Sequence, residues 1–155
     1  MELYLTQHGR ATPKEEDPDR PLSPEGREET ERVARVAAAA GLRVDAIWHS
    51  GKARARQTAD ILAAALEPEG GVRRRQWLGP LDDPRKAVEA AREEEKTVLL
   101  VGHLPFMSRL AALLLAGNPE ADVVDVRNSG IVALAETDGG GWTLRWYLRP
   151  ELATA

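Results

Sequence analysis

The chain of 155 residues contains no cysteine, which excludes disulfide bonds, thiol catalysis and metal sites ligated by cysteine. Its longest apolar run, around residues 110–116, is too short to span a membrane. The N-terminus lacks the basic region, apolar core and cleavage site of a signal peptide. With a net charge of −4, the sequence also lacks the basic excess of a broad nucleic-acid or membrane surface. These absences predict a cytoplasmic protein that binds neither nucleic acid nor membrane.

The residues that are present fit a globular domain, with 43% hydrophobic and 30% charged residues. The length predicts one domain, residues 1–155, with enough chain to bury a core. Short apolar runs alternate with helical stretches, which is typical of α/β proteins. We therefore expect a three-layer α/β/α fold around a mostly parallel sheet. The Asp-Gly-Gly-Gly turn at 138–141 predicts a C-terminal antiparallel hairpin.

Periodicity and capping signals place the individual elements. Ser23 and Pro24 are typical of a helix start, and Gly41 of its end. Strands are expected at 2–7, 46–48, 72–78, 97–102, 123–126, 131–136 and 142–148. Helices are expected at 24–40, 53–66, 83–94 and 105–115. The polar loop at 12–21 is long enough to lie over a site.

Three polar side chains follow strands whose carboxyl ends should share one edge of the sheet: His8, Ser50 and His103. Ligands of open α/β sheets bind just beyond such ends. One histidine alone is more often structural, but two at these ends favour a site. Gly9 is expected to let the backbone approach an anion, and Arg10 to add positive charge nearby.

Arg54 lies on a helical stripe beside the apolar face of its helix, so we expect it to point inward toward the strand ends. A buried guanidinium needs an anionic partner. Arg56 points the other way and faces Asp60, as in an ordinary surface pair. His103 precedes a helix start at Pro105, which favours a bound anion. Together these groups predict a phosphate site, where phosphoryl transfer to an imidazole nitrogen is a plausible covalent route.

Four segments resemble the motifs of the histidine phosphatase superfamily, also called phosphoglycerate-mutase-like. They are LTQHGRA (5–11), LSPEG (22–26), SGKARARQTA (50–59) and VGHLP (101–105). Their order and spacing agree with the family over nearly the whole chain. The short length is most similar to the phosphohistidine phosphatase branch of the SixA type.

The resemblance implies a metal-independent phosphatase in which His8 becomes transiently phosphorylated while Arg54 and His103 hold the phosphoryl oxygens. The family also uses a carboxylic acid to protonate the leaving group. Its match here is Asp83, with Asp82 as second choice, and an equal alternative is that Asp83 only caps a helix. Further substrate-binding residues would be Gln7, Gly9, Arg10, Ser50 and Gly102. No H-x-x-x-H spacing supports a metal site formed by His8, His103 and Asp83.

Gln7 departs from the family, whose pattern has arginine there. Glutamine keeps an N–H donor but loses the charge and the fork geometry. A hydrogen bond to a charged group contributes ~1.5–3 kcal/mol, so its loss would slow the reaction by roughly one to two orders of magnitude. We therefore predict a phosphatase acting on phosphohistidine, preferably on a protein, or on a small phosphate ester. The alternatives are a weakened or inactive phosphate- or phosphoprotein-binding regulator and a plain α/β scaffold.

Arg73, Arg74 and Arg75 are interpreted as a solvated edge strand, where charge blocks unwanted pairing. Docking of a phosphoprotein on this basic run is the alternative.

Overall fold

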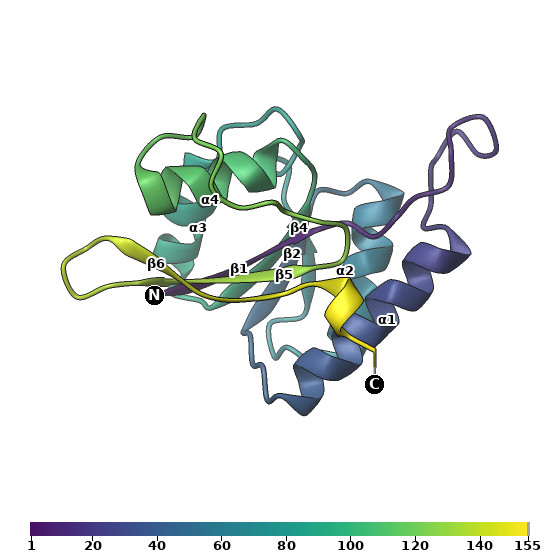
Figure 1. The fold of residues 1–155 in the computed structure, drawn as a ribbon, viewed down its shortest axis with the longest axis horizontal. Coiled ribbons are helices and arrows are strands. Elements are labelled where there is room, and N and C mark those ends of the chain that lie inside the picture. The colour runs from purple at the N-terminus through teal and green to yellow at the C-terminus, as the bar shows by residue number, and fades with distance from the viewer. Residues whose placement is uncertain (155) are drawn as a thin grey trace.

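The computed structural model describes residues 1–154, which form one six-stranded sheet in the order β3-β2-β4-β1-β5-β6 with helices on both faces (Figure 1). The strands are β1 (Glu2–Gln7), β2 (Ala46–His49), β3 (Val72–Arg74), β4 (Val98–Gly102), β5 (Ile131–Glu136) and β6 (Trp142–Leu148). The helices are α1 (Pro24–Ala39), α2 (Ala53–Leu66), α3 (Arg85–Glu94) and α4 (Phe106–Ala116), followed by a 3-10 turn at Pro150–Leu152. No helix within the described residues combines the length and the apolar character needed to cross a membrane.

Strands β1 to β4 run parallel to one another, whereas β5 runs antiparallel to β1, and β6 antiparallel to β5. β4 pairs in parallel with both β1 and β2, and β3 extends the sheet beyond β2. β5 returns antiparallel beside β1 and forms a hairpin with β6. This arrangement confirms the predicted α/β fold with a mostly parallel sheet and a C-terminal hairpin. It also brings the carboxyl ends of β1, β2 and β4 to one edge of the sheet.

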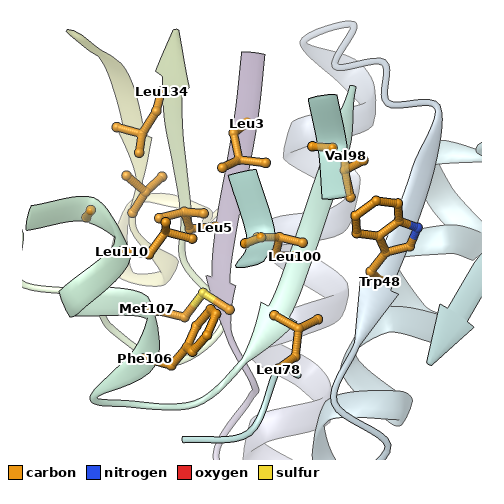
Figure 2. Close-up of a cluster of buried hydrophobic side chains, with 14 of the residues drawn as sticks. Leu3, Leu5, Trp48, Leu78, Val98, Leu100, Phe106, Met107, Leu110 and Leu134 are labelled. Atoms are coloured by element: carbon orange, nitrogen blue, oxygen red, sulfur yellow. The ribbon is translucent and has the colours of Figure 1, made fainter. Parts of the chain in front are cut away.

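Side chains that alternate along the central strands fill two separate cores. On β4, Leu100 packs beneath α3 and α4 with Phe106 and Met107 (Figure 2). Its neighbour Leu99 packs against α1 and α2. Successive side chains of a strand point to opposite faces of the sheet, so a strand covered on both faces must be apolar throughout. β4 is buried at all five positions for this reason.

The start of α1 holds the chain against the end of β1. Ser23 is the N-cap, and its hydroxyl accepts a hydrogen bond from the Gly26 N–H at 3.0 Å. A Cβ atom on Gly26 would lie 2.0 Å from the backbone oxygen of Arg10, so only glycine permits this approach. The LSPEG sequence therefore fixes how the chain returns from the loop at 12–21 to the sheet.

The predicted strand at 123–126 was wrong. Val124 and Val126 are buried in the core beneath α3 and α4, but their segment pairs with no strand. The backbone groups of the residues that follow each valine are hydrogen-bonded to one side chain instead. The Tyr147 hydroxyl donates to the carbonyl of Asp125 at 2.8 Å and accepts from the Arg127 N–H at 2.7 Å. The valines thus have the burial of a strand without its ladder.

Other boundaries moved by a few residues. β3 ends at Arg74 rather than at 78. The Arg75 N–H makes a last bond to β2, to the carbonyl of His49 at 2.8 Å, and the chain then turns, with the Leu78 N–H bonded to the carbonyl of Arg75. The last two helices begin one or two residues later than expected because Pro84 and Pro105 occupy the cap positions.

Candidate active site

Two imidazoles and one hydroxyl converge where β1, β2 and β4 end. The rings of His8 and His103 lie 5.0 Å apart between centroids, and both are almost fully buried. The Ser50 hydroxyl lies 2.6 Å from Nε2 of His103, and the His8 N–H donates to the carbonyl of Gly102 at 2.9 Å. The structure therefore brings together the three strand-end side chains that the sequence singled out.

The orientation of His8 leaves one ring nitrogen unprotonated. Its Nδ1 lies 2.7 Å from the carbonyl oxygen of Gly9, which can only accept, so Nδ1 carries the proton. In the neutral ring, Nε2 then holds the free lone pair. This nitrogen accepts a hydrogen bond from Nε of Arg54 at 3.3 Å. A lone pair beside a guanidinium is suited to attack an anionic centre that the guanidinium also binds.

Both imidazoles are held neutral. The pKa of His8 is lowered to about 4, chiefly by burial and also by the charges of Arg54 and Arg20, against the opposing effect of the Gly9 hydrogen bond. Burial likewise lowers the pKa of His103 to about 3, with contributions from His8, Arg54 and nearby Lys52. Near pH 7 the nucleophilic form of His8 is thus the form that the folded protein contains.

Gln57 and Thr58, which follow Arg54 on α2, hold the start of this helix against the β1–α1 connection. The Thr58 hydroxyl accepts from the Gly9 N–H at 2.9 Å and donates to the carbonyl of Arg54 at 2.7 Å. Oε1 of Gln57 accepts from the Leu22 N–H at 2.8 Å. Together they tie the first turn of α2 to both ends of the β1–α1 connection and hold Arg54 beside His8.

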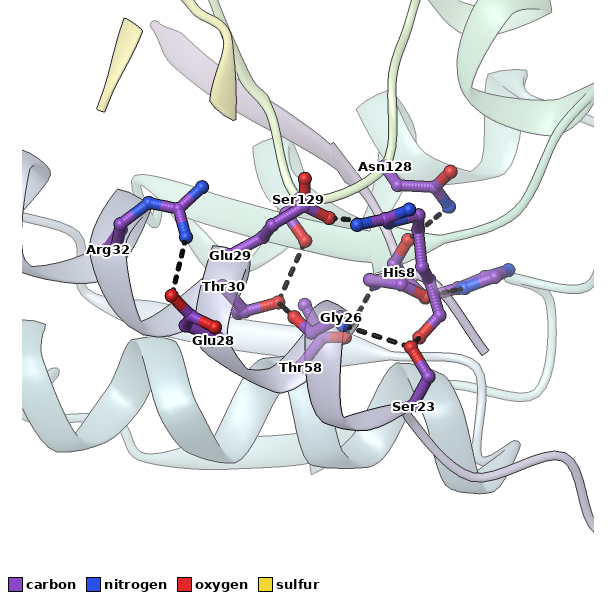
Figure 3. A network of polar contacts seen from close by, with 12 residues as sticks. His8, Ser23, Gly26, Glu28, Glu29, Thr30, Arg32, Thr58, Asn128 and Ser129 are labelled. Carbon is purple, nitrogen blue, oxygen red and sulfur yellow. Dashed lines mark hydrogen bonds and ion pairs between the residues drawn. The ribbon is translucent and has the colours of Figure 1, made fainter. Parts of the chain in front are cut away.

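A second polar network, which the sequence reasoning missed, supports His8 from the β5 side (Figure 3). Nδ2 of Asn128 donates to the His8 carbonyl at 2.8 Å, and the Ser129 hydroxyl lies 2.8 Å from that of Thr30 on α1. A Cβ atom on Gly9 would lie 2.7 Å from Oγ1 of Thr30, so this glycine is needed for packing against the network. The only sequence signal was a polar break, Asn128-Ser129-Gly130, before the apolar β5.

The remaining predicted substrate-binding residues lie around this centre in different ways. A Cβ atom on Gly102 would lie 2.7 Å from Met107, which gives this glycine a packing reason too. Arg10 is half exposed and pairs with Glu29, whose carboxylate lies 2.8 Å from its Nε. Gln7 is the last residue of β1 and is aligned with Gly102 at the end of β4, at the sheet edge where His8 follows.

Neither predicted acid is bonded to the imidazoles. The Asp83 carboxylate is largely exposed and accepts from the Arg85 N–H at 3.0 Å, while Asp82 accepts from the Gly79 N–H at 2.8 Å. In residues 1–154, no carboxylate forms a hydrogen bond or ion pair with His8, Arg54 or His103. The same part of the chain contains no group of three or more His, Asp or Glu side chains arranged to hold a metal ion.

Comparison with known proteins places this constellation in a family. Residues 3–76 match the histidine phosphatase superfamily (branch 1). An uncharacterized protein from Picosynechococcus is 36% identical over 142 residues, which cover 86% of this chain and 84% of that protein. The chain belongs to the histidine phosphatase superfamily. It is accordingly a hydrolase of the phosphatase class.

Solved structures of this superfamily share the fold. The protein histidine phosphatase SixA complexed with tungstate aligns with a TM-score of 0.83 at 24% identity, over 97% of each chain. A proposed phosphohistidine phosphatase SixA from Agrobacterium tumefaciens aligns with a TM-score of 0.76 at 28% identity, over 96% of this chain and 97% of that one. The histidine phosphatase fold therefore spans nearly the full length of the chain.

Proposed function

We propose that the protein is a single-domain phosphohistidine phosphatase that works through a phosphoryl group carried transiently on His8. The observation that carries the proposal is the unprotonated Nε2 of a neutral, buried His8, which lies 3.3 Å from Nε of Arg54. A hydrogen bond to Gly9 fixes the ring from the other side. The nucleophile is thus oriented before substrate arrives, and the cation that would bind the phosphoryl oxygens is already beside it.

The reaction divides into two displacements at phosphorus. In the first, the Nε2 lone pair of His8 forms a bond to phosphorus as the bond from phosphorus to the substrate nitrogen breaks, and that nitrogen leaves with the bonding electrons. In the second, water forms a bond to phosphorus as the bond to Nε2 breaks, the bonding electrons return to Nε2, and inorganic phosphate leaves with both protons of the water, one of which it then releases to solvent. Arg54 and a hydrogen-bonded His103 stabilise the charge on the transferring group.

No carboxylate of residues 1–154 is bonded to His8, Arg54 or His103, which favours a substrate whose leaving group needs little protonation. An alkoxide leaving group needs an acid close to its oxygen, whereas the imidazole of a phosphohistidine protonated at its other nitrogen departs as a neutral molecule. Asp82 and Asp83 are engaged with Gly79 and Arg85 instead of the imidazoles. The site therefore suits phosphohistidine better than phosphoserine or a sugar phosphate.

Short connections at the site edge support a protein substrate. Three residues, 50–52, join β2 to α2, and three, 103–105, join β4 to α4. The connections at 8–23, 75–84 and 117–130 are longer, and the one at 8–23 projects from the carboxyl end of β1 (purple, upper right of Figure 1). The short connections after β2 and β4 leave room for a phosphohistidine that is presented on a protein surface.

The test is phosphate release from a phosphohistidine peptide, with phosphoserine peptide as the matched substrate. We expect the wild type to release phosphate from phosphohistidine far faster than from phosphoserine, and His8→Ala to release it from neither. Equal rates on the two peptides would refute the assignment of substrate class. Release that persists in His8→Ala would refute the covalent route.

Gln7 favours a second candidate, a phosphohistidine-binding regulator with negligible turnover. The arginine of the family's pattern is absent here, and glutamine supplies no charge in its place. A Gln7→Arg variant separates the two proposals. Under the phosphatase proposal the wild type is active and the variant gains about tenfold or more. Under the regulator proposal the wild type binds the peptide without releasing phosphate, and only the variant turns over.

A further inference from the structure

The two arms of the β1–α1 connection are bonded to each other at its base, the part next to the site formed by residues 11–12 and 20–22. Ala11 and Leu22 form an antiparallel bridge, and the Thr12 N–H donates to the carbonyl of Pro21 at 2.7 Å. Leu22 is also bonded to Gln57 on α2, directly beside the turn that carries Arg54. The residues at this base are therefore fixed relative to His8 and α2, whatever the tip of the loop does.

Arg20 occupies that base in a conformation with a cost. Its φ of +48° lies in the left-handed region, which non-glycine residues seldom adopt and which is concentrated at functional sites. Nε donates to the carbonyl of Thr12 at 3.3 Å, which anchors the guanidinium across the two arms of the loop. The side chain is half buried, and its two terminal nitrogens make no hydrogen bond to the residues that the structure describes.

No carboxylate neutralises Arg20. Within residues 1–154, Arg20 and Arg54 form no ion pair, whereas Arg10, whose backbone bonds to the same connection, is paired with Glu29. The charge of Arg20 lowers the pKa of both His8 and Arg54, so it acts on the same small region as they do. Two cations that disfavour each other's charge in this way are stabilised once an anion binds to both.

We propose that Arg20 is a phosphate-binding residue that supplies the positive charge missing at Gln7. Its free guanidinium nitrogens would bind the transferring phosphoryl group from the loop side, while Arg54 binds it from α2. This inference rests on the proposed function, because it assigns a further ligand to the same phosphoryl group. It explains how a member of the family retains its anion site with glutamine in the first motif.

The experiment is a double-mutant cycle between Arg20→Gln and Gln7→Arg, read by tungstate binding and by phosphate release. In the wild-type background we expect Arg20→Gln to weaken tungstate binding and to lower kcat/KM by about 10- to 100-fold. In the Gln7→Arg background the same change should cost only a few-fold, since the second cation is present. Arg20→Lys should recover part of both losses because it keeps the charge.

Lys14→Gln is the matched control, since it removes an exposed cation from the same loop and should leave binding and turnover at wild-type values. Arg20→Gln that behaves like Lys14→Gln would overturn the proposal. So would an equal loss in both Gln7 backgrounds, or an equal loss for the Lys and Gln variants of Arg20. The binding arm keeps this inference separate from the proposed function: if the wild type binds tungstate but releases no phosphate, the phosphatase proposal fails while the cycle still decides the role of Arg20.

Discussion

At the β3 edge of the sheet, Arg73 and Arg75 share the carboxylate of Glu94, whereas at the carboxyl end of β1 Arg54 has no carboxylate partner and faces His8. Arg75 lies 2.6 Å from Glu94 and also stacks over Trp48, with its guanidinium carbon 4.2 Å from the ring centroid. The sequence interpretation of this basic run as fully solvated was therefore wrong for Arg75. Its charge and its planar group are satisfied within the protein.

The difference between these regions separates stability from function. Cations that are paired and stacked hold β3 and α3 onto the sheet. Cations without a carboxylate, beside neutral imidazoles, reduce stability and are satisfied only by an anionic ligand. Substitutions at the β3 edge should therefore alter unfolding and spare turnover, and those at the β1 end should do the reverse.

The largest effect is expected from His8→Ala, which removes the nucleophile itself. Phosphate release should fall by about a thousandfold or more, because the covalent route is lost. The melting temperature of the variant should not fall enough to account for this loss. A variant that stays active, or one that simply fails to fold, would remove the contrast between the two regions.

Arg54→Ala is expected to have the next largest effect on turnover. Losing one preorganised donor to the transferring group should lower kcat/KM by about 10²- to 10³-fold. Because Arg54 has no carboxylate partner, the free energy of unfolding should stay the same or rise, which denaturant titration measures. A destabilised variant with normal kinetics would show that Arg54 is a structural residue.

Between pH 7 and pH 5, the free energy of unfolding should depend on the titration of groups at the site and not on groups at the β3 edge. The pKa of His8 is about 4 in the folded chain against 6.5 in an unfolded one, so between these values the unfolded chain binds the extra proton. The free energy of unfolding should fall by about 2 kcal/mol from pH 7 to pH 5 on account of His8 and by a similar amount on account of His103, so the fall in His8→Gln should be about half that of the wild type.

Glu94→Gln is the control for this pH dependence. Arg75 lowers the pKa of Glu94 below its ordinary value of 4.5, so its stabilising effect is complete above that pH and is lost only as the pH falls through the folded value. The slope between pH 7 and pH 5 should therefore be the same in Glu94→Gln and the wild type. A flat wild-type profile over this range would contradict the neutral, buried state of His8.

Arg75→Ala is the counterpart of Arg54→Ala at the other region. Loss of the ion pair and of the stacking on Trp48 should lower the free energy of unfolding by about 1–2 kcal/mol. The kinetics on a phosphohistidine peptide should match those of the wild type. Reduced turnover at unchanged stability would instead support docking of the phosphoprotein on this edge.

The smallest effect is expected from Asp83→Asn. Its carboxylate is exposed and bonded to Arg85, so turnover of phosphohistidine should change only a few-fold. A large loss, above all with phosphoserine as substrate, would return Asp83 to the role of acid.

Much of the fold could be predicted because local signals agreed with the final packing. Ser23 and Pro24 marked the start of α1, and the wholly apolar β4 marked the centre of the sheet. Segment 123–126 could not be predicted, since its backbone is satisfied by the Tyr147 hydroxyl from β6, a contact that no local pattern contains. An alternating apolar pattern indicates which side chains are buried, but a buried segment need not pair with a neighbouring strand.

The site was predictable to the extent that it is built from strand ends and one helix face. Those rules brought His8, Ser50, Arg54 and His103 together. They gave no signal for Asn128, whose bond to His8 spans 120 positions of sequence. They also gave no signal for Arg20, because its position follows from the closure of a loop and not from any periodic element.

The most direct measurement is to trap the phosphorylated enzyme. The protein is mixed with a phosphohistidine peptide, quenched within the first turnover, and mapped by mass spectrometry under conditions that preserve phosphohistidine. The account predicts one acid-labile phosphoryl group, on Nε2 of His8, that appears before free phosphate and is absent from His8→Ala. Phosphate release without any phosphorylated His8, or label found on His103 instead, would contradict it.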